Sequence, residues 1–123
     1  MGGVCDADFG LHLLGHWSRD LGVIGLEAAV HKLTGHPAEL FGLKDRGQLR
    51  AGAAADLMLF DPARVGRGKR VRVNDLPAGA SRLRASALGL HGVWINGVQI
   101  VDASGPIASA RRPGQVLRDF AVR

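Results

Sequence analysis

The stretch that decides the fold reads Val93-Trp94-Ile95-Asn96-Gly97-Val98-Gln99-Ile100-Val101. Asn96-Gly97 stands between two runs rich in β-branched residues. A two-residue type I′ turn needs positive φ at both central positions, and Asn and Gly adopt that conformation at low cost. The stretch therefore predicts a β-hairpin over residues 93–101, and with it an antiparallel sheet in the last third of the chain.

Strands are also predicted upstream of this hairpin. Residues 55–61 form a short run, apolar on both faces, that Pro62 ends, which is typical of a buried strand. Residues 63–82 are rich in Gly and Arg without a clear period, so we expect a loop with one strand near Val71 and Val73. From Gly105 onward the prolines predict an extended arm, or a short helix over residues 116–120.

The first 43 residues instead have helical spacing. Helices are predicted over residues 9–21, 25–34 and 37–41, with Gly35 and Gly42 ending the second and the third. Helices followed by strands favour an α+β fold over an alternating α/β fold. The apolar positions on the helical faces are Phe9, Leu13, Leu14, Trp17, Leu26, Ala29, Val30 and Leu33.

Composition describes a small globular chain. It has 123 residues, of which 46% are hydrophobic, so one modest core is expected. No apolar run approaches the ~20 residues that a membrane helix needs, so no membrane association is expected. Cys5 is the single cysteine, which predicts a structural or incidental thiol in a reducing cytoplasm.

The charge is uneven along the chain. The formal net charge is +5, made up of −3 over residues 1–61 and +8 over residues 62–123. A basic half can indicate a nucleic-acid partner. Thirteen of the sixteen cations are Arg, they are scattered through strand-like segments, and aromatic residues make up only 5%. Nucleic-acid binding is therefore the less favoured alternative.

One pattern deserves comparison with a metal site. Asp8, His12 and His16 are spaced i, i+4 and i+8 and share a helix face, and two His at i, i+4 can bind zinc when a third ligand joins them. No Glu lies between the two His to act as a base. A solvated or half-buried helix face is the alternative interpretation, and we assign no metal site here. Asp56 and Asp61 flank a predicted strand.

Four motifs follow one another along the chain. The first is Leu26–Leu43, which contains Leu26-Glu27-Ala28-Ala29-Val30-His31-Lys32-Leu33-Thr34 followed by Pro37-Ala38 and Phe41-Gly42-Leu43. The second is Lys44–Gly52 followed by Ala55–Asp61. The others are the hairpin 93–101 and Pro113-Gly114-Gln115-Val116-Leu117-Arg118, with weaker support from Asp75–Gly79 and Cys5-Asp6-Ala7. In this order they resemble the N-acyl-D-amino-acid deacylases of the amidohydrolase superfamily, and the resemblance implies that Asp56 is a structural turn residue.

The resemblance implies a fold and an activity for a longer parent protein. The parent would be a (β/α)8 barrel with a small β-sandwich, in which residues 1–43 supply the last outer helices of the barrel and residues 44–123 a part of the sandwich. A zinc site in the barrel would activate a water to hydrolyse the amide bond of an N-acyl-D-amino acid. The metal ligands and the catalytic Asp would precede residue 1, and Asp6 matches the segment downstream of that Asp.

We therefore expect a C-terminal fragment that has no catalytic, cofactor-binding or metal-binding residue of its own and is inactive alone. The expected partners are the missing barrel or a second copy, because the apolar helix faces need a cover. Leaving such side chains exposed forfeits roughly 1.5–3 kcal/mol each. The alternatives are a non-catalytic module that associates with itself and, less favoured, a basic nucleic-acid binder.

Overall fold

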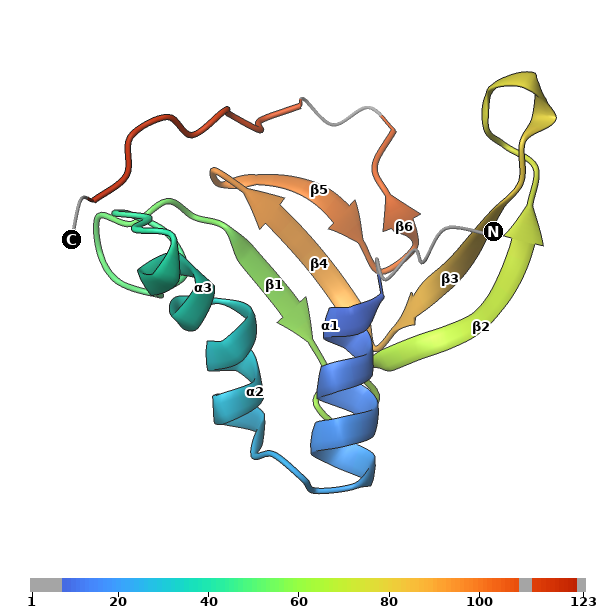
Figure 1. The fold of residues 1–123 in the computed structure, drawn as a ribbon, viewed down its shortest axis with the longest axis horizontal. Coiled ribbons are helices and arrows are strands. Elements are labelled where there is room, and N and C mark those ends of the chain that lie inside the picture. The colour runs from blue at the N-terminus through green and yellow to red at the C-terminus, as the bar shows by residue number, and fades with distance from the viewer. Residues whose placement is uncertain (1–7, 109–111, 122–123) are drawn as a thin grey trace.

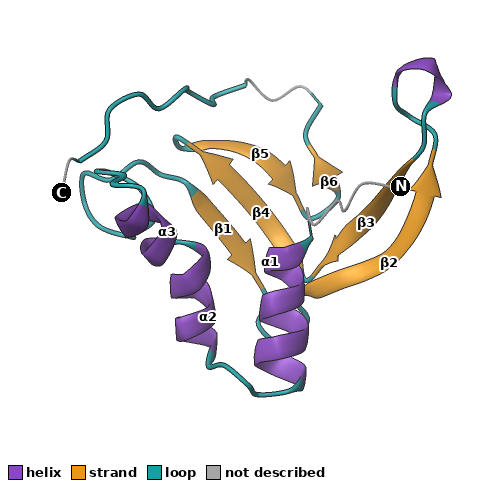
Figure 2. Ribbon diagram, in the orientation of Figure 1, coloured by secondary structure: helices purple, strands orange, loops and turns teal. Residues whose placement is uncertain are grey.

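The computed structural model describes residues 8–108 and 112–121, and Cys5 and Asp6 lie outside them. Helices lead and antiparallel strands follow, which confirms the predicted α+β fold (Figures 1 and 2). The helical elements are α1 (Phe9–His12), a π-helix (Leu13–Asp20), α2 (Leu26–Leu33), α3 (Gly35–Leu40) and a 3₁₀ turn (Pro77–Gly79). The strands are β1 (Leu57–Phe60), β2 (Gly66–Val73), β3 (Arg82–Leu88), β4 (Leu90–Ile95), β5 (Val98–Asp102) and β6 (Gly105–Pro106).

The predicted first helix forms, but it changes type along its length. It continues from α1 into the π-helix Leu13–Asp20, and the amide of Leu21 donates to the carbonyl of His16 at 3.0 Å, five residues back. The wider turn lays Gly15 directly against the backbone of Val65, where an added Cβ would lie 2.7 Å from the Val65 carbonyl oxygen. This contact brings the helix onto the start of β2.

The second and third helices differ from the prediction at their junction. Gly35 was expected to end α2, yet it is the buried first residue of α3, which begins two residues before Pro37. Thr34 supplies the break instead, with φ −129° and ψ −81°. Gly35 is small enough to let His31 lie beside it, because a Cβ there would be 2.8 Å from the His31 ring. Gly42, at φ +67°, ends α3 as predicted.

The buried core of the described residues is small. Leu14 of the π-helix, Ala29 of α2 and Val65 before β2 form its centre, and Ala38 of α3 is also buried. Half-buried side chains surround the centre, so helices and strands share one core. These surrounding residues are Leu11, Leu13, Ile24, Leu26, Val30, Leu33 and Phe60.

The predicted hairpin forms the middle of a four-stranded antiparallel sheet with the order β1-β4-β5-β6. Ile95 pairs with Val98, and the two turn residues Asn96 and Gly97 have φ of +47° and +78°. Both values lie in the left-handed region that a type I′ turn requires. The hairpin prediction over residues 93–101 is therefore confirmed.

The strand predicted over residues 55–61 exists as β1, but the prediction that it is buried is wrong for this chain. β1 lies at the edge of the sheet and pairs with β4 alone. Leu57, Met58 and Leu59 are exposed, and Leu59 keeps 55% of its surface accessible. Phe60 at the end of the strand packs against the core, whereas the three residues before it stay exposed.

Within residues 63–82, the strand predicted near Val71 and Val73 is confirmed as the end of β2, whereas the loop predicted before it is wrong from Gly66 onward. β2 and β3 form a two-stranded antiparallel ribbon that bends away from the main sheet (Figure 1). The alternation of side chains that identifies a strand in a sequence is interrupted here. The causes are Gly66, Gly68 and a break in register between Arg67 and Arg70. Gly89, at φ +63°, then connects β3 to β4 where a Cβ would lie 2.6 Å from the Val65 nitrogen.

Residues 112–121 form the C-terminal arm, and the structure shows the extended alternative, without a helix over residues 116–120. In Figure 1 the arm is the red segment that returns past β5 toward α3. The amide of Ala121 donates to the carbonyl of Gly42 at 2.7 Å. The arm thus links the end of the strand region to the end of the helical region.

Candidate functional site

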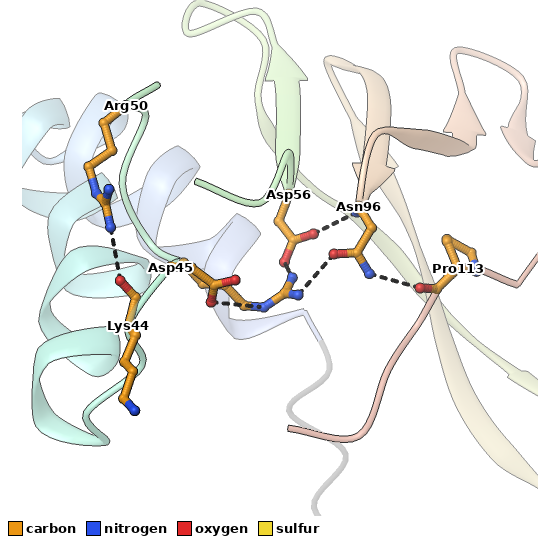
Figure 3. A network of polar contacts seen from close by, with 7 residues as sticks. Lys44, Asp45, Arg50, Asp56, Asn96 and Pro113 are labelled. Atoms are coloured by element: carbon orange, nitrogen blue, oxygen red, sulfur yellow. Dashed lines mark hydrogen bonds and ion pairs between the residues drawn. The ribbon is translucent and has the colours of Figure 1, made fainter. Parts of the chain in front are cut away.

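The densest polar cluster among the described residues joins four distant segments (Figure 3). Arg46 comes from the loop after α3, Asp56 precedes β1, Asn96 is in the β4–β5 turn, and Pro113 is in the C-terminal arm. We call these four residues the Arg46 hub.

Hydrogen bonds connect all four residues of the Arg46 hub. Arg46 donates through Nη1 to Asp56 and through Nη2 to Asn96 Oδ1 at 2.9 Å. The other carboxylate oxygen of Asp56 accepts a hydrogen bond from the backbone N–H of Asn96 at 2.8 Å. The side-chain Nδ2 of Asn96 donates to the Pro113 carbonyl at 2.8 Å. The buried Arg46 Nε has no hydrogen bond but lies 3.7 Å from Asp45 Oδ1. The hub therefore holds segments together and supports the structural role predicted for Asp56.

Electrostatics keep Asp56 ionised. Partial burial raises the pKa of Asp56, but hydrogen bonds from the Asn96 amide and from Arg46, together with the Arg46 charge, outweigh it. The net effect is a pKa below the ordinary value for a carboxyl group. A general base needs a pKa near the operating pH, and Asp56 is moved in the opposite direction.

The structure separates the members of the Asp8, His12 and His16 pattern. Both Asp8 oxygens face Arg70, at 3.1 Å from Nε and 2.9 Å from Nη2, and Arg67 Nε lies 3.4 Å away. The hydrogen bond from Arg70 is the largest influence on Asp8 and lowers its pKa. Asp8 thus serves as the counter-ion that joins α1 to the β2–β3 ribbon.

The two histidines of this pattern contact each other and a tryptophan. Their rings stack with centroids 4.8 Å apart and planes 13° apart, and Trp17 meets both rings edge-on. Within residues 8–108 and 112–121, no three His, Cys, Asp or Glu side chains come together as metal ligands would. No helix in this part of the chain is both long and apolar enough to cross a membrane.

An apolar cleft of about 370 Å³ runs beside β1. Its walls come from α2, from the loop after α3 and from β1 itself. The lining includes Leu33, Leu49, Leu57, Met58 and Phe60. Sequence reasoning found neither this cleft nor Arg46, because both arise from segments that are distant in sequence and lack any local signature.

Comparison with known proteins agrees with the motifs. Residues 3–101 match the model described as the amidohydrolase family. N-acyl-D-aspartate deacylase of Alcaligenes xylosoxydans xylosoxydans is 43% identical over 99 residues, which cover 80% of this chain and 18% of that protein. D-aminoacylase of the same organism is 44% identical over 88 residues, covering 72% of this chain and 16% of that protein.

Solved structures give the same result. A D-aminoacylase variant in complex with copper chloride superimposes with a TM-score of 0.69 at 37% identity, over 89% of this chain and 21% of that one. A D-aminoacylase studied for its binuclear metal center gives 0.63 at 37% identity, over 81% and 19%. The chain spans about a fifth of the length of these relatives. With four fifths of its length matched by the family model, the chain belongs to the amidohydrolase family.

Proposed function

We propose that this chain is the C-terminal part of a metal-dependent hydrolase that cleaves the amide bond of an N-acyl-D-amino acid. The observation that carries the proposal is the agreement between the family match and the relatives. N-acyl-D-aspartate deacylase, D-aminoacylase and N-acyl-D-glutamate deacylase are 38–44% identical to the chain, and each is matched over less than a fifth of its length. Their names share one reaction class and differ in the amino acid.

The chemistry of this proposal lies outside residues 1–123. A zinc site needs at least three convergent ligands, and the described residues do not offer them. Asp8 is bound to Arg70, and Asp56 is bound to Arg46 and Asn96. We therefore propose that the metal ligands and the catalytic Asp belong to the missing part, and we derive no catalytic step for this chain.

The contribution of this chain is structural in the proposal. Residues 1–43 would close the outside of a barrel, and residues 44–123 would form a part of the adjoining sandwich. The Arg46 hub supports this role, since it fastens the loop after α3 to the hairpin turn and to the C-terminal arm. The exposed apolar β1 also fits a segment that is covered in a longer protein.

A chimera tests the proposal. This chain would replace the matching fifth of D-aminoacylase from Alcaligenes xylosoxydans xylosoxydans. We expect a folded, zinc-containing chimera whose kcat on an N-acyl-D-amino acid stays within about tenfold of the relative, a change of about 1.4 kcal/mol in the barrier. The chain alone should show neither turnover nor stoichiometric zinc.

Two results would contradict the proposal. Turnover by the purified chain alone, with stoichiometric zinc, would place the site within residues 1–123, and variants of His12 and His16 would then locate it. A folded, zinc-loaded chimera with kcat reduced by about a thousandfold or more would show that the exchanged part carries a catalytic group. An Asp56→Asn chimera is the matched control, because it should lose stability while kcat per folded enzyme is kept.

A further inference from the structure

The turn between β4 and β5 carries a chemically labile pair of residues, Asn96-Gly97. The backbone nitrogen of the residue after an asparagine can attack the side-chain amide carbon, and Gly97 hinders this attack least because it has no Cβ. A bond forms between Gly97 N and Asn96 Cγ, the bond from Cγ to Nδ2 breaks, and ammonia leaves with the proton of the Gly97 amide. Water then opens the succinimide to aspartate or isoaspartate.

In the folded chain, hydrogen bonds engage both the attacking nitrogen and the amide that it would attack. The Gly97 N–H donates to the carbonyl of Ala55 at 2.9 Å. Asn96 Nδ2 donates to the Pro113 carbonyl at 2.8 Å, and Asn96 Oδ1 accepts from Arg46 Nη2 at 2.9 Å (Figure 3). Ring closure requires the Asn96 side chain to turn toward Gly97. The contacts that Arg46 and Pro113 make with this side chain must therefore break before the reaction.

Deamidation would change the Arg46 hub at the contact that fastens the C-terminal arm. A carboxylate at position 96 has no N–H for the Pro113 carbonyl and sets oxygen against oxygen there. It also places a second carboxylate beside Asp56, which already accepts the backbone N–H of this residue. Isoaspartate adds a carbon to the main chain of a turn in which Asn96 and Gly97 have φ of +47° and +78°. Either product removes the anchor of the arm at the hairpin.

We propose that Asn96 is a deamidation site that the Arg46 hub keeps unreactive, and that its deamidation releases the C-terminal arm from the hairpin. Opening of the hub sets the rate, because only molecules in which Asn96 has left Arg46 and Pro113 can react. The loss of ammonia is irreversible, so the carboxylate at position 96 records past openings of the hub. This inference goes beyond the proposed function, because every contact that it uses lies within the described residues of this chain.

Peptide mapping by mass spectrometry, after incubation at mildly alkaline pH, measures the deamidation rate of Asn96. The rate in the folded chain should be at least about tenfold below the rate in guanidinium chloride, because local opening limits the reactive population. Asn74, the other asparagine of the sequence, is the internal control, since it is exposed between β2 and the 3₁₀ turn. Its rate should change much less on unfolding. Equal rates for Asn96 in the folded and the unfolded chain would overturn the proposal.

Two variants of Arg46 test whether the hub is the cause. Folded Arg46→Met should deamidate at Asn96 about tenfold faster than the wild type, because a hydrogen bond from a charged donor is lost. Arg46→Lys keeps the charge beside Asp56 but lacks the planar fork that reaches both partners, so its rate should be intermediate. An unchanged rate in a folded variant would overturn the proposal, and so would a slower rate, which would mean that Arg46 activates the amide. If neither variant folds, the comparison of folded and unfolded wild type decides.

Amide exchange at Ala121 tests the release of the arm, because the N–H of Ala121 donates to the Gly42 carbonyl at the far end of the arm. Asn96→Asp reproduces one deamidation product and should lower the protection of this amide by about tenfold. Asn74→Asp is the matched control and should leave the protection unchanged. Full protection of the Ala121 amide in Asn96→Asp would show that the arm stays in place, and the second part of the proposal would be wrong.

Discussion

Asp56 and Arg46 form the ion pair within the Arg46 hub. Arg46 is largely buried, with 13% of its side chain exposed, whereas Asp56 retains 34%. A guanidinium in such a position is costly to leave without its counter-ion. Asp45 lies 3.7 Å from Nε, but it is mostly exposed and compensates only in part. Substituting Asp56 therefore tests how strongly the ion pair with Arg46 stabilises the fold.

The pH dependence of this contact has a definite sign. The pKa of Asp56 is lower in the folded chain than the ~3.9 of an unfolded Asp. Its stabilisation is therefore complete above the unfolded pKa and is lost as the pH falls through the folded pKa. Asp56→Asn should lower the free energy of unfolding by about 1 to 2 kcal/mol at pH 7, after allowance for solvent screening. The difference should shrink as the pH approaches 3.

Urea unfolding of wild type and variant between pH 3 and pH 7 measures this difference. Asp20→Asn is the comparison, since Asp20 forms an exposed pair with Arg19 on the π-helix. It should change the free energy of unfolding by less than about 0.5 kcal/mol. If Asp56→Asn lowered the free energy of unfolding equally at every pH, the charge of Asp56 would not be the cause of the loss.

At the scale of elements, the sequence predicts the elements that form through local contacts alone. Asn96-Gly97 requires no distant contact to form its turn, and the hairpin appears where it was expected. The ends of α2 and α3 depend instead on how Gly35 packs beside His31, and the prediction placed the junction wrongly. The exposure of Leu57, Met58 and Leu59 on β1 could not be read from the sequence, because an apolar run of this kind is typical of a buried strand. The sequence pattern described the strand correctly but not its environment.

The candidate site follows the same division. The structural role of Asp56 was predictable, because the resemblance to the deacylase family implies it. Its partners Arg46 and Asn96 were not, since they lie 10 and 40 residues away and only folding brings them together. Of the β2–β3 ribbon, only a strand near Val71 and Val73 was predicted, because the register break and the exposed cations conceal the alternation of a half-buried strand. In each case, the contact or strand pairing is set by long-range packing, which the periodicity of the sequence does not reveal.

Two glycines in the first helix allow packing and helix propensity to be compared. A Cβ at Gly10 would lie 3.6 Å from a Leu33 methyl group, an ordinary contact. A Cβ at Gly15 would lie 2.7 Å from the Val65 carbonyl and 2.9 Å from Gly66 Cα, both of them backbone atoms. Gly10→Ala should therefore stabilise by up to about 1 kcal/mol through helix propensity. Gly15→Ala should destabilise by about 1 to 3 kcal/mol through overpacking.

Thermal unfolding of both variants measures the contrast, because the substitution is identical and only the neighbour differs. If Gly15→Ala were as stable as Gly10→Ala, Gly15 would not lie in close contact with the start of β2. The shared core of Leu14, Ala29 and Val65 would then need another arrangement.

At the scale of the whole molecule, the balance between buried and exposed surface limits stability. An unfolded chain of 13.0 kDa exposes about 18,900 Å², and a compact fold would bury about 12,500 Å² of it. This chain, with 9053 Å² accessible, buries about 9,800 Å². The urea m-value scales with the surface that unfolding exposes, so for the monomer it should be about four fifths of that of a compact protein of the same mass.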